Sequence, residues 1–261
     1  MMERLVKDIE NWMTSNMLKL NGDKSDIMVL NGPRRPRIEL PPITICDESV
    51  FKSDSTTLLG VEVNSTLSLK SHVKNTTKCC FYKLHNLFKI RRFLSEDAAK
   101  TIVHTLMTSK LDYCNSVLNG LPNTTLEFLV RVQKAAARLI SNKTKFQHIS
   151  PVMKDLHWLP IKKRIEYKIL VLTFKCVHHP TPAYLTELLH NRTNKGTRAD
   201  NKNLLVVPKV NKSTLDAWAK FQFYSTFSLE PAAQPPASSL EIFKKKIKDT
   251  LIYKNFVCNF V

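Results

Sequence analysis

The chain has 261 residues, of which 43% are hydrophobic and 24% are charged, so it is not wholly disordered. Its 40 lysines and arginines outnumber its 22 acidic residues, and the formal charge of +18 favours a polyanionic partner. Nucleic acid is the usual partner of this kind, and an acidic membrane face or acidic protein is less common. The five glycines lack the spacing of a Rossmann fingerprint or a Walker A loop, which excludes both nucleotide-binding folds.

The sequence predicts a protein of the cytoplasm or nucleus that is neither secreted nor inserted in a membrane. Its longest strongly apolar run, residues 169–174, is far shorter than the roughly 20 residues that span a bilayer, and no signal peptide follows Met1. The six cysteines form no Cys-x-x-Cys pair, and most fall in apolar patterns, so we expect reduced core residues. The alternative, a zinc site, needs four converging ligands, and the local spacing does not provide them.

The first predicted element is an amphipathic helix at residues 2–16, because Leu5, Ile9, Trp12 and Met13 recur at helical spacing. In residues 17–69, glycine, proline, asparagine and aspartate separate short apolar runs, a pattern typical of strands joined by tight turns. The predicted strands include residues 27–30, 43–46 and 58–63.

From residue 70 the apolar period becomes helical. Ser95, followed by Glu96 and Asp97, predicts the start of another helix that continues to about Val117, because serine caps helices and carboxylates favour the positive end of the dipole. The preceding helix, which begins near residue 70, has a stripe of apolar residues on one face and lysines on the other. The stripe is Val73, Thr77, Cys80, Leu84 and Leu87, and the lysines are Lys74, Lys78, Lys83 and Lys89.

Capping boxes and prolines predict the remaining helices. Thr124 and Glu127 have capping-box spacing ahead of one helix, and Ser238 and Glu241 have it ahead of a terminal helix. Proline at the first helical position predicts three more helices. These prolines are Pro151, Pro160 and Pro182.

The elements together predict an α+β fold in three parts. Residues 1–69 form a small part rich in β-hairpins, and residues 70–190 form a mainly α-helical part. Residues 191–261 form a basic, partly disordered and loosely attached tail with a terminal helix, in which residues 191–215 are expected to be mobile.

Catalytic chemistry has little support in the sequence. Two-metal phosphoryl transfer needs closely paired carboxylates, and the chain contains no Asp-Asp pair. The adjacent acids Asp47-Glu48 and Glu96-Asp97 are accounted for by solvation and the helix dipole. There is no Gly-x-Ser-x-Gly elbow, and His178-His179 is interpreted as a helix end. We predict no catalytic residue and no metal site.

The basic clusters are more informative. Residues 131–175 hold eleven lysines and arginines against two acids, a local charge of +9. Arg131, Lys134 and Arg138 form one helical stripe without a facing acid, which leaves phosphate binding or a solvated basic face as interpretations. Three further cations fall in the first turn of a predicted helix, where they oppose the dipole and require a compensating anion. They are Lys162, Lys163 and Arg164.

A second candidate patch lies between two predicted helices and consists of Lys89, Arg91 and Arg92. Phosphate contacts of this kind would bind without choosing a sequence. Trp12, Trp158 and most phenylalanines fall on apolar stripes, so we expect them to pack in the core rather than stack on bases.

Three stretches stand out as motifs: residues 16–25 read NMLKLNGDKS, residues 109–116 read SKLDYCNS and residues 156–165 read LHWLPIKKRI. They resemble the reverse transcriptases of non-long-terminal-repeat retrotransposons of the LINE-type, jockey-like kind. The first is similar to the N-x-L-x-L-N-x-x-K-T stretch that follows the catalytic carboxylates in that family. The second is close to the family's S-R-L-D-Y-C-N-S, and GLP follows at residues 120–122. The third is another specific match. Further matches, in the family's order, are residues 59–61, 72–73, 132–139 and 148–151.

The resemblance implies a remnant of the polymerase palm at residues 1–69 and a thumb-like helical region after it. The family's fingers and its Mg²⁺-binding Asp-Asp loop would lie upstream of Met1, so the fragment is expected to be catalytically incapable alone and to hold no cofactor. By the same resemblance, Lys24 would lie near the incoming triphosphate, and the turn at Gly60 would hold the primer end. The implied partners are the RNA or DNA backbone and the missing N-terminal half of the polymerase.

Residues 226–236 depart from the family, which has a W-N-x-L-P motif there. Allowed codons shifted by one base can spell this motif, so we hypothesise two compensating frameshifts in a decaying element copy and expect this segment to be disordered. The genomic DNA tests the idea. Two further interpretations stay open: a host-recruited, non-enzymatic interaction module, and polymerase activity in trans with a complementing fragment.

Overall fold

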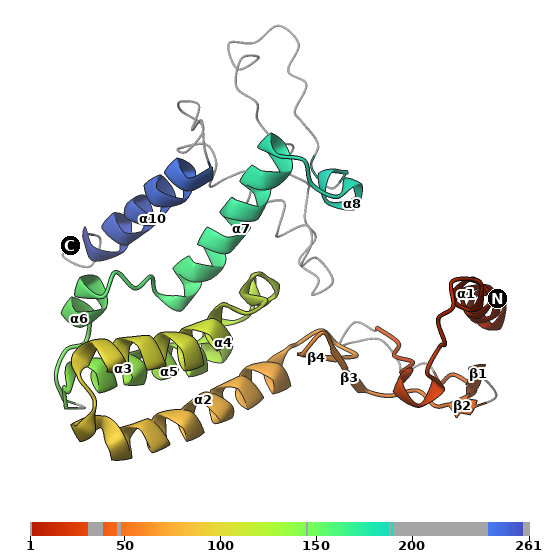
Figure 1. Cartoon of the computed structure of the whole chain (residues 1–261), viewed down its shortest axis with the longest axis horizontal. Coiled ribbons are helices and arrows are strands. Elements are labelled where there is room, and N and C mark those ends of the chain that lie inside the picture. The colour runs from red at the N-terminus through yellow and green to blue at the C-terminus, as the bar shows by residue number, and fades with distance from the viewer. Residues whose placement is uncertain are drawn as a thin grey trace, which may run out of the picture. The chain divides into compact units, whose positions relative to one another are not determined.

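Two small β-hairpins and a mainly helical region make up the computed structural model, an α+β structure with far more helix than strand (Figure 1). The structure describes residues 2–30, 39–45, 48–144, 146–187, 189 and 240–257. The chain divides into two compact units between His72 and Val73. The sequence predicts a boundary after residue 69, where the spacing of apolar residues becomes helical, so the observed division lies three residues later.

The first unit contains two antiparallel hairpins. In one, Ile43 pairs with Val50, and in the other Leu58 pairs with Val61. Leu59 (φ 48°) and Gly60 (φ 79°) close the second hairpin, and two consecutive left-handed residues are the signature of a type I′ turn. The elements of this unit are α1 (Met2–Ser15), the 3₁₀ turn η1 (Gly22–Lys24), β1 (Ile43–Ile45), β2 (Glu48–Val50), β3 (Ser55–Leu58) and β4 (Val61–Asn64).

Three expectations about this unit are wrong. Residues 58–63 do not form one strand, because Leu59 and Gly60 make the turn between β3 and β4. Residues 27–30 form no strand, because Ile27 makes only an isolated parallel bridge to Lys52 and the pairing does not continue into a ladder. The helix at residues 2–16 is confirmed as α1, but Trp12, which is expected to pack in the core, is 63% exposed, and Leu5 and Ile9 are exposed beside it. Helical periodicity therefore predicts the helix, but it does not predict that another element covers its apolar face.

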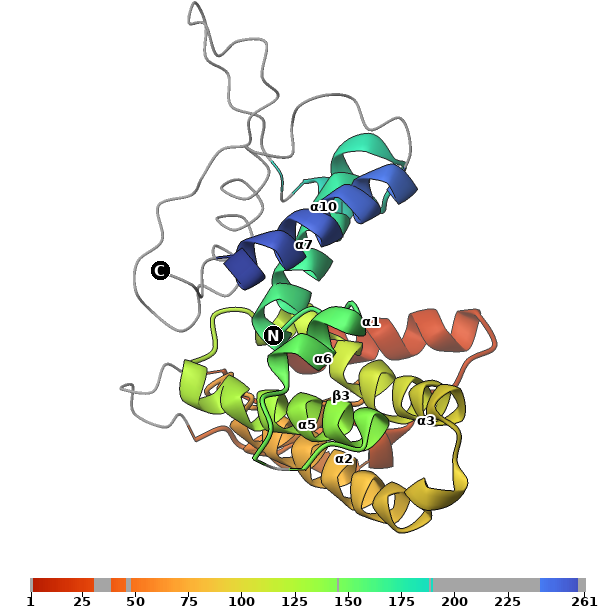
Figure 2. The same ribbon diagram turned by 90° about the vertical axis from the view of Figure 1, so that its left-hand side faces the viewer.

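The second unit is helical. Its helix α2 begins at Lys70, just before the division between the units. Helices α3 and α5 pack on each other, and α2 lies alongside them in both views (Figures 1 and 2). The helices are α2 (Lys70–Ile90), α3 (Glu96–Val103), α4 (Ser109–Asp112), α5 (Asn123–Ser141), α6 (Ser150–Asp155), α7 (Ile161–His178), α8 (Ala183–Thr186) and α10 (Leu240–Val257).

The core of this unit follows the predicted stripes. The five residues predicted for the apolar face of α2 are its buried residues. Val103 and Met107, which follow the start of α3, are completely buried, as is Val132 of α5. Each such side chain contributes about 1.5–3 kcal/mol relative to an exposed position. Ser95 caps α3 as predicted, because its hydroxyl accepts a hydrogen bond from the Ala98 N–H at 3.2 Å.

The helix predicted to reach Val117 ends earlier. It passes from α3 through a π-helical turn, η3 (His104–Thr108), and stops with α4 at Asp112. Tyr113 is extended, Cys114 is left-handed with φ 48°, and a 3₁₀ turn, η4 (Asn115–Leu118), follows. The DYCNS motif at residues 112–116 therefore contains the end of α4 and the turn into η4, and does not continue the α-helix.

Helix starts differ from the prediction by about one residue, as is usual for helix ends. Pro151 lies in the first turn of α6 as predicted, whereas Pro160 and Pro182 occupy the position just before α7 and α8. The capping box of Thr124 and Glu127 does not form, because α5 begins at Asn123 and has no side-chain cap.

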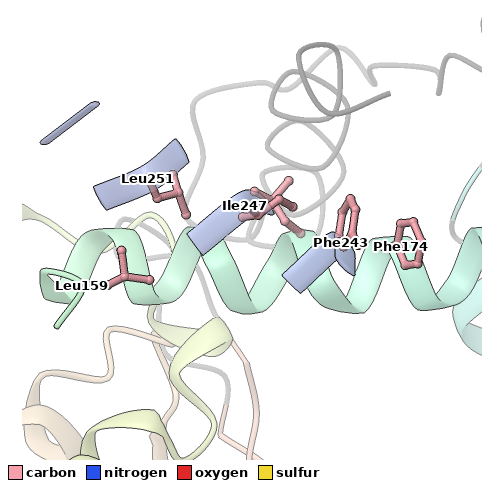
Figure 3. Close-up of a cluster of buried hydrophobic side chains, with 6 residues drawn as sticks. Leu159, Phe174, Phe243, Ile247 and Leu251 are labelled. Atoms are coloured by element: carbon pink, nitrogen blue, oxygen red, sulfur yellow. The ribbon is translucent and has the colours of Figure 1, made fainter. Parts of the chain in front are cut away.

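The terminal helix is confirmed as α10, and it is not loosely attached. Phe243, Ile247 and Leu251 pack against α7, and the rings of Phe243 and Phe174 stack with their centroids 3.8 Å apart (Figure 3). Leu159 and Leu170 are the other buried members of this cluster, and Figure 3 shows Leu159 near Leu251. The predictions for residues 191–215, residues 226–236 and the Ser238 cap fall outside the described residues.

The cysteines with a described environment are free thiols, and among them Cys80 is buried while Cys79, Cys114 and Cys176 are half-buried. The expectation that most cysteines lie in the core is therefore wrong for three of these four. In the described part of the chain, no helix is both long and apolar enough to cross a membrane.

Candidate nucleic-acid interface

Arg91 is engaged inside the fold. It lies in the 3₁₀ turn η2 (Arg91–Phe93) directly after α2. Its Nε donates to the Leu139 carbonyl at 2.7 Å, its Nη2 to the Ile140 carbonyl at 2.8 Å and its Nη1 to the Leu94 carbonyl at 2.7 Å. Leu139 and Ile140 belong to the last turn of α5, where carbonyls lack helical partners and the helix dipole is negative. Arg91 therefore ties the end of α2 to the end of α5.

The other members of this patch face solvent. Lys89 and Arg92 are exposed, and the Arg92 guanidinium lies 4.6 Å from the centroid of the Phe93 ring, itself 73% exposed. In this predicted cluster, Lys89 and Arg92 are thus accessible to a polyanion, whereas Arg91 is held by backbone carbonyls.

Arg164, in the first turn of α7, is also an internal residue. Its Nη1 donates to both carboxylate oxygens of Asp112, at 3.0 and 2.8 Å, and its Nε donates to the Leu159 carbonyl at 2.9 Å. The amide nitrogen of Gln133 donates to the same carbonyl at 2.7 Å. The Arg164 side chain is only 12% exposed. This ion pair joins residues 109–116 and 156–165, the two most distinctive motifs of the sequence.

Two of the three cations in the first turn of α7 form ion pairs with acids of the protein. Asp112 compensates Arg164, and Glu166 compensates Lys163 at 2.7 Å, with 28% of the lysine and 23% of the glutamate side chain exposed. Lys162 is exposed and forms no ion pair with any residue that the structure describes. The anions expected near these cations are therefore supplied largely by the protein itself, and the cluster presents mainly Lys162 to solvent.

The basic stripe of α5, formed by Arg131, Lys134 and Arg138, also differs from the prediction. Arg131 has a facing acid, because its Nε lies 4.0 Å from an oxygen of Glu127, one turn earlier. Both side chains are about half exposed, so the pair contributes at most about 1 kcal/mol. Lys134 and Arg138 are half-buried, and the Nε of Arg138 is buried without a hydrogen-bond partner among the described residues.

Lys24 and Gly60 belong to the first unit, whereas the other eight predicted site residues belong to the second. Lys24 is exposed at the end of η1, where its backbone N–H donates to the Asn21 side chain at 3.3 Å. Gly60 lies in the turn of the second hairpin. The roles that the resemblance implies for these two residues stay predictions.

The outer face of α2 is a basic surface of which the predicted patches include only Lys89. The helix contains five lysines and no acid, and Lys74, Lys78 and Lys89 are exposed. Aromatic side chains lie among them: Phe81 is 39% exposed and Phe88 is 49% exposed. The sequence contains a signal for this surface, because the 21 residues of α2 include five lysines and no acidic residue.

The expectation that most phenylalanines pack in the core is wrong for the described part of the chain, where Phe174 and Phe243 are buried and six others are exposed. Trp158 does pack, partly buried, against a cluster that includes Met153, as predicted. The exposed phenylalanines are Phe51, Phe81, Phe88, Phe93, Phe128 and Phe146.

Within the described ranges, no three His, Cys, Asp or Glu side chains come together as a possible metal site. Comparison with known proteins finds no matching family model, no matching curated protein and no matching solved structure.

Proposed function

We propose that the chain is a fragment of a retrotransposon reverse transcriptase that cannot extend a primer alone and that binds the RNA or DNA backbone without sequence preference. The support is the order of its motifs, which follows that of the LINE-type family along most of residues 3–210. We place it in the cytoplasm or nucleus, where RNA and DNA are both present.

The observation that carries the binding proposal is the set of exposed lysines without a protein partner. Lys74, Lys78, Lys89 and Lys162 are exposed, and none forms an ion pair with another described residue. The ammonium group of lysine is a point charge that suits phosphate but does not distinguish bases. Such contacts release counterions from the nucleic acid, so the affinity depends strongly on salt.

A salt titration tests the binding proposal. The affinity for a labelled duplex of about 20 base pairs is measured by fluorescence anisotropy between about 50 and 300 mM NaCl. Three or four phosphate contacts predict a slope of about −3 in log K against log salt. The variant with Lys74, Lys78 and Lys162 all changed to alanine should give a slope nearer to about −1. A flat salt response, or no binding at the lowest salt, would contradict the proposal.

The lack of catalysis is tested separately by primer extension. Two-metal chemistry needs carboxylates that converge on Mg²⁺, and the sequence offers no Asp-Asp pair. Purified chain with a primed template, dNTPs and Mg²⁺ or Mn²⁺ should give no extension. Extension that persists after removal of contaminating polymerases would refute this part of the proposal.

A second candidate, a host-recruited and non-enzymatic interaction module, is favoured by the apolar side chains on α1. Leu5, Ile9 and Trp12 are more than half exposed, and apolar faces of this kind often bind proteins. Binding that is insensitive to salt and lost in the variant Ile9→Lys would favour this candidate over nucleic-acid binding.

A further inference from the structure

The aromatic residues of α2 share a face with its lysines. Phe81 and Phe88 are seven residues apart, so they lie within about 20° of each other and about 10 Å apart along the helix axis. Lys74 precedes Phe81 by the same seven residues, and Lys78 precedes it by one turn. Along about four turns, this face therefore carries two lysines followed by two aromatic rings.

Both rings are exposed although they lie next to buried positions of α2. Leu84 lies between Phe81 and Phe88 on the neighbouring strip of the helix and is 1% exposed, so buried positions exist next to both. Leaving a phenylalanine half exposed forgoes part of the roughly 1.5–3 kcal/mol that burial provides. Phe81 and Phe88 thus place two exposed rings among the lysines of α2, and Tyr82, about 100° around the helix from Phe81, is a further exposed aromatic side chain.

We propose that this face of α2 binds single-stranded nucleic acid, with unpaired bases stacked on Phe81 and Phe88 and phosphates held by Lys74 and Lys78. The inference depends on the proposed function and names its substrate class. In a duplex the bases already stack on one another, so aromatic rings gain contact only with unpaired bases. Because α2 carries no acid, nothing on the helix repels the strand.

The test compares labelled oligo-dT and oligo-U of about 20 nucleotides with a duplex of equal length, using the full chain and fluorescence anisotropy. We expect single strands to bind at least about tenfold more tightly than the duplex. The variant Phe81→Leu/Phe88→Leu keeps apolar side chains but removes the rings. It should lose at least about tenfold in affinity for single strands, keep its salt slope, and bind duplex within about twofold of the original chain.

Matched variants separate stacking from loss of structure or charge. Phe81→Tyr/Phe88→Tyr retains the rings and should retain single-strand affinity. Phe146→Leu removes an 85% exposed ring elsewhere and should change nothing. Lys74→Ala/Lys78→Ala should reduce the single-strand salt slope by about 1.4. The two oligonucleotides distinguish RNA from DNA as the source of the strand.

The two proposals fail in different ways. If duplex and single strands bind equally, or if the leucine variant binds single strands normally, the stacking inference is overturned while salt-dependent backbone binding stands. If neither polymer binds, both proposals are refuted. Leucine variants that bind single strands normally but lose a protein partner would assign the face to protein recognition instead.

Discussion

Removal of the Asp112 carboxylate should destabilise the second unit by about 2–3 kcal/mol. Arg164 would keep its bond to the Leu159 carbonyl but lose both carboxylate contacts while its side chain stays 12% exposed. Breaking a fully buried pair costs about 3–5 kcal/mol, because a charge is left without a partner. The Asp112 side chain is 43% exposed, so water replaces part of the loss and the lower estimate applies.

A double-mutant cycle isolates this interaction. The variants are Asp112→Ala, Arg164→Met, which keeps the aliphatic stem, and the two combined. Urea unfolding followed by far-UV circular dichroism gives the free energy of unfolding of each. Because the double variant leaves no unpaired charge, it should be less destabilised than the sum of the single variants, by about 1–3 kcal/mol.

An exposed pair of similar length provides the control. Lys100 and Glu96 lie 2.9 Å apart on α3, but their side chains are 42% and 63% exposed. The same cycle there should give a coupling below about 1 kcal/mol. If the losses at Asp112 and Arg164 add within about 0.5 kcal/mol, the pair does not join the two motifs energetically and the reasoning from burial is wrong.

Three further changes test other parts of the second unit. Arg91→Met should cost about 2–3 kcal/mol in urea unfolding, because carbonyls at the end of α5 lose a charged donor, whereas Arg92→Met should cost less than about 0.5 kcal/mol. Burial raises the pKa of the Cys80 thiol to about 11, so the unfolded chain releases this proton near its ordinary pKa of about 8.5 while the folded chain keeps it. The free energy of unfolding should therefore fall by about 2–3 kcal/mol as the pH rises from about 8.5 to 11. Urea unfolding at several pH values in this range should show that the Cys80→Ala variant lacks this fall. If the original chain and the variant depend on pH equally, the Cys80 thiol is not the group responsible. Phe243→Ala should cost about 3 kcal/mol and increase hydrogen exchange throughout α10, since the stacked ring on Phe174 is lost; unchanged exchange would show that α10 docks without it.

Local rules predicted the parts of this fold that depend on nearby residues. All five buried positions of α2 follow from a spacing of three and four, and the Ser95 cap follows from a hydroxyl placed before two acids. The sequence also predicts that each long element is a helix and not a strand. Apolar residues that recur at helical spacing over about 15 residues do not match the two-residue period of a strand.

Contacts between distant residues could not be predicted in this way. Asp112 and Arg164 are 52 positions apart, and Arg91 is 48 positions from Leu139. No periodicity connects such residues, so the sequence pattern alone assigns both arginines to phosphate. It also places the end of the helix near Val117, whereas α4 ends at Asp112. The exposure of Trp12 has a related cause, because amphipathicity does not identify a partner for the apolar face.

The basic residues divide by chemistry as well as by position. Arg91 and Arg164 each direct several N–H groups of a planar guanidinium at carbonyl or carboxylate oxygens, a geometry that lysine cannot reproduce. The cations on the outer face of α2 are all lysines, whose flexible stems place one charge without a fixed direction. Any preference that this face has among nucleic acids should therefore come from the rings of Phe81 and Phe88, while the lysines set the salt dependence. Exchanging Lys74 and Lys78 for arginine, which keeps the charge, should leave the salt slope unchanged, and a marked change in slope would mean that directed hydrogen bonds contribute to binding.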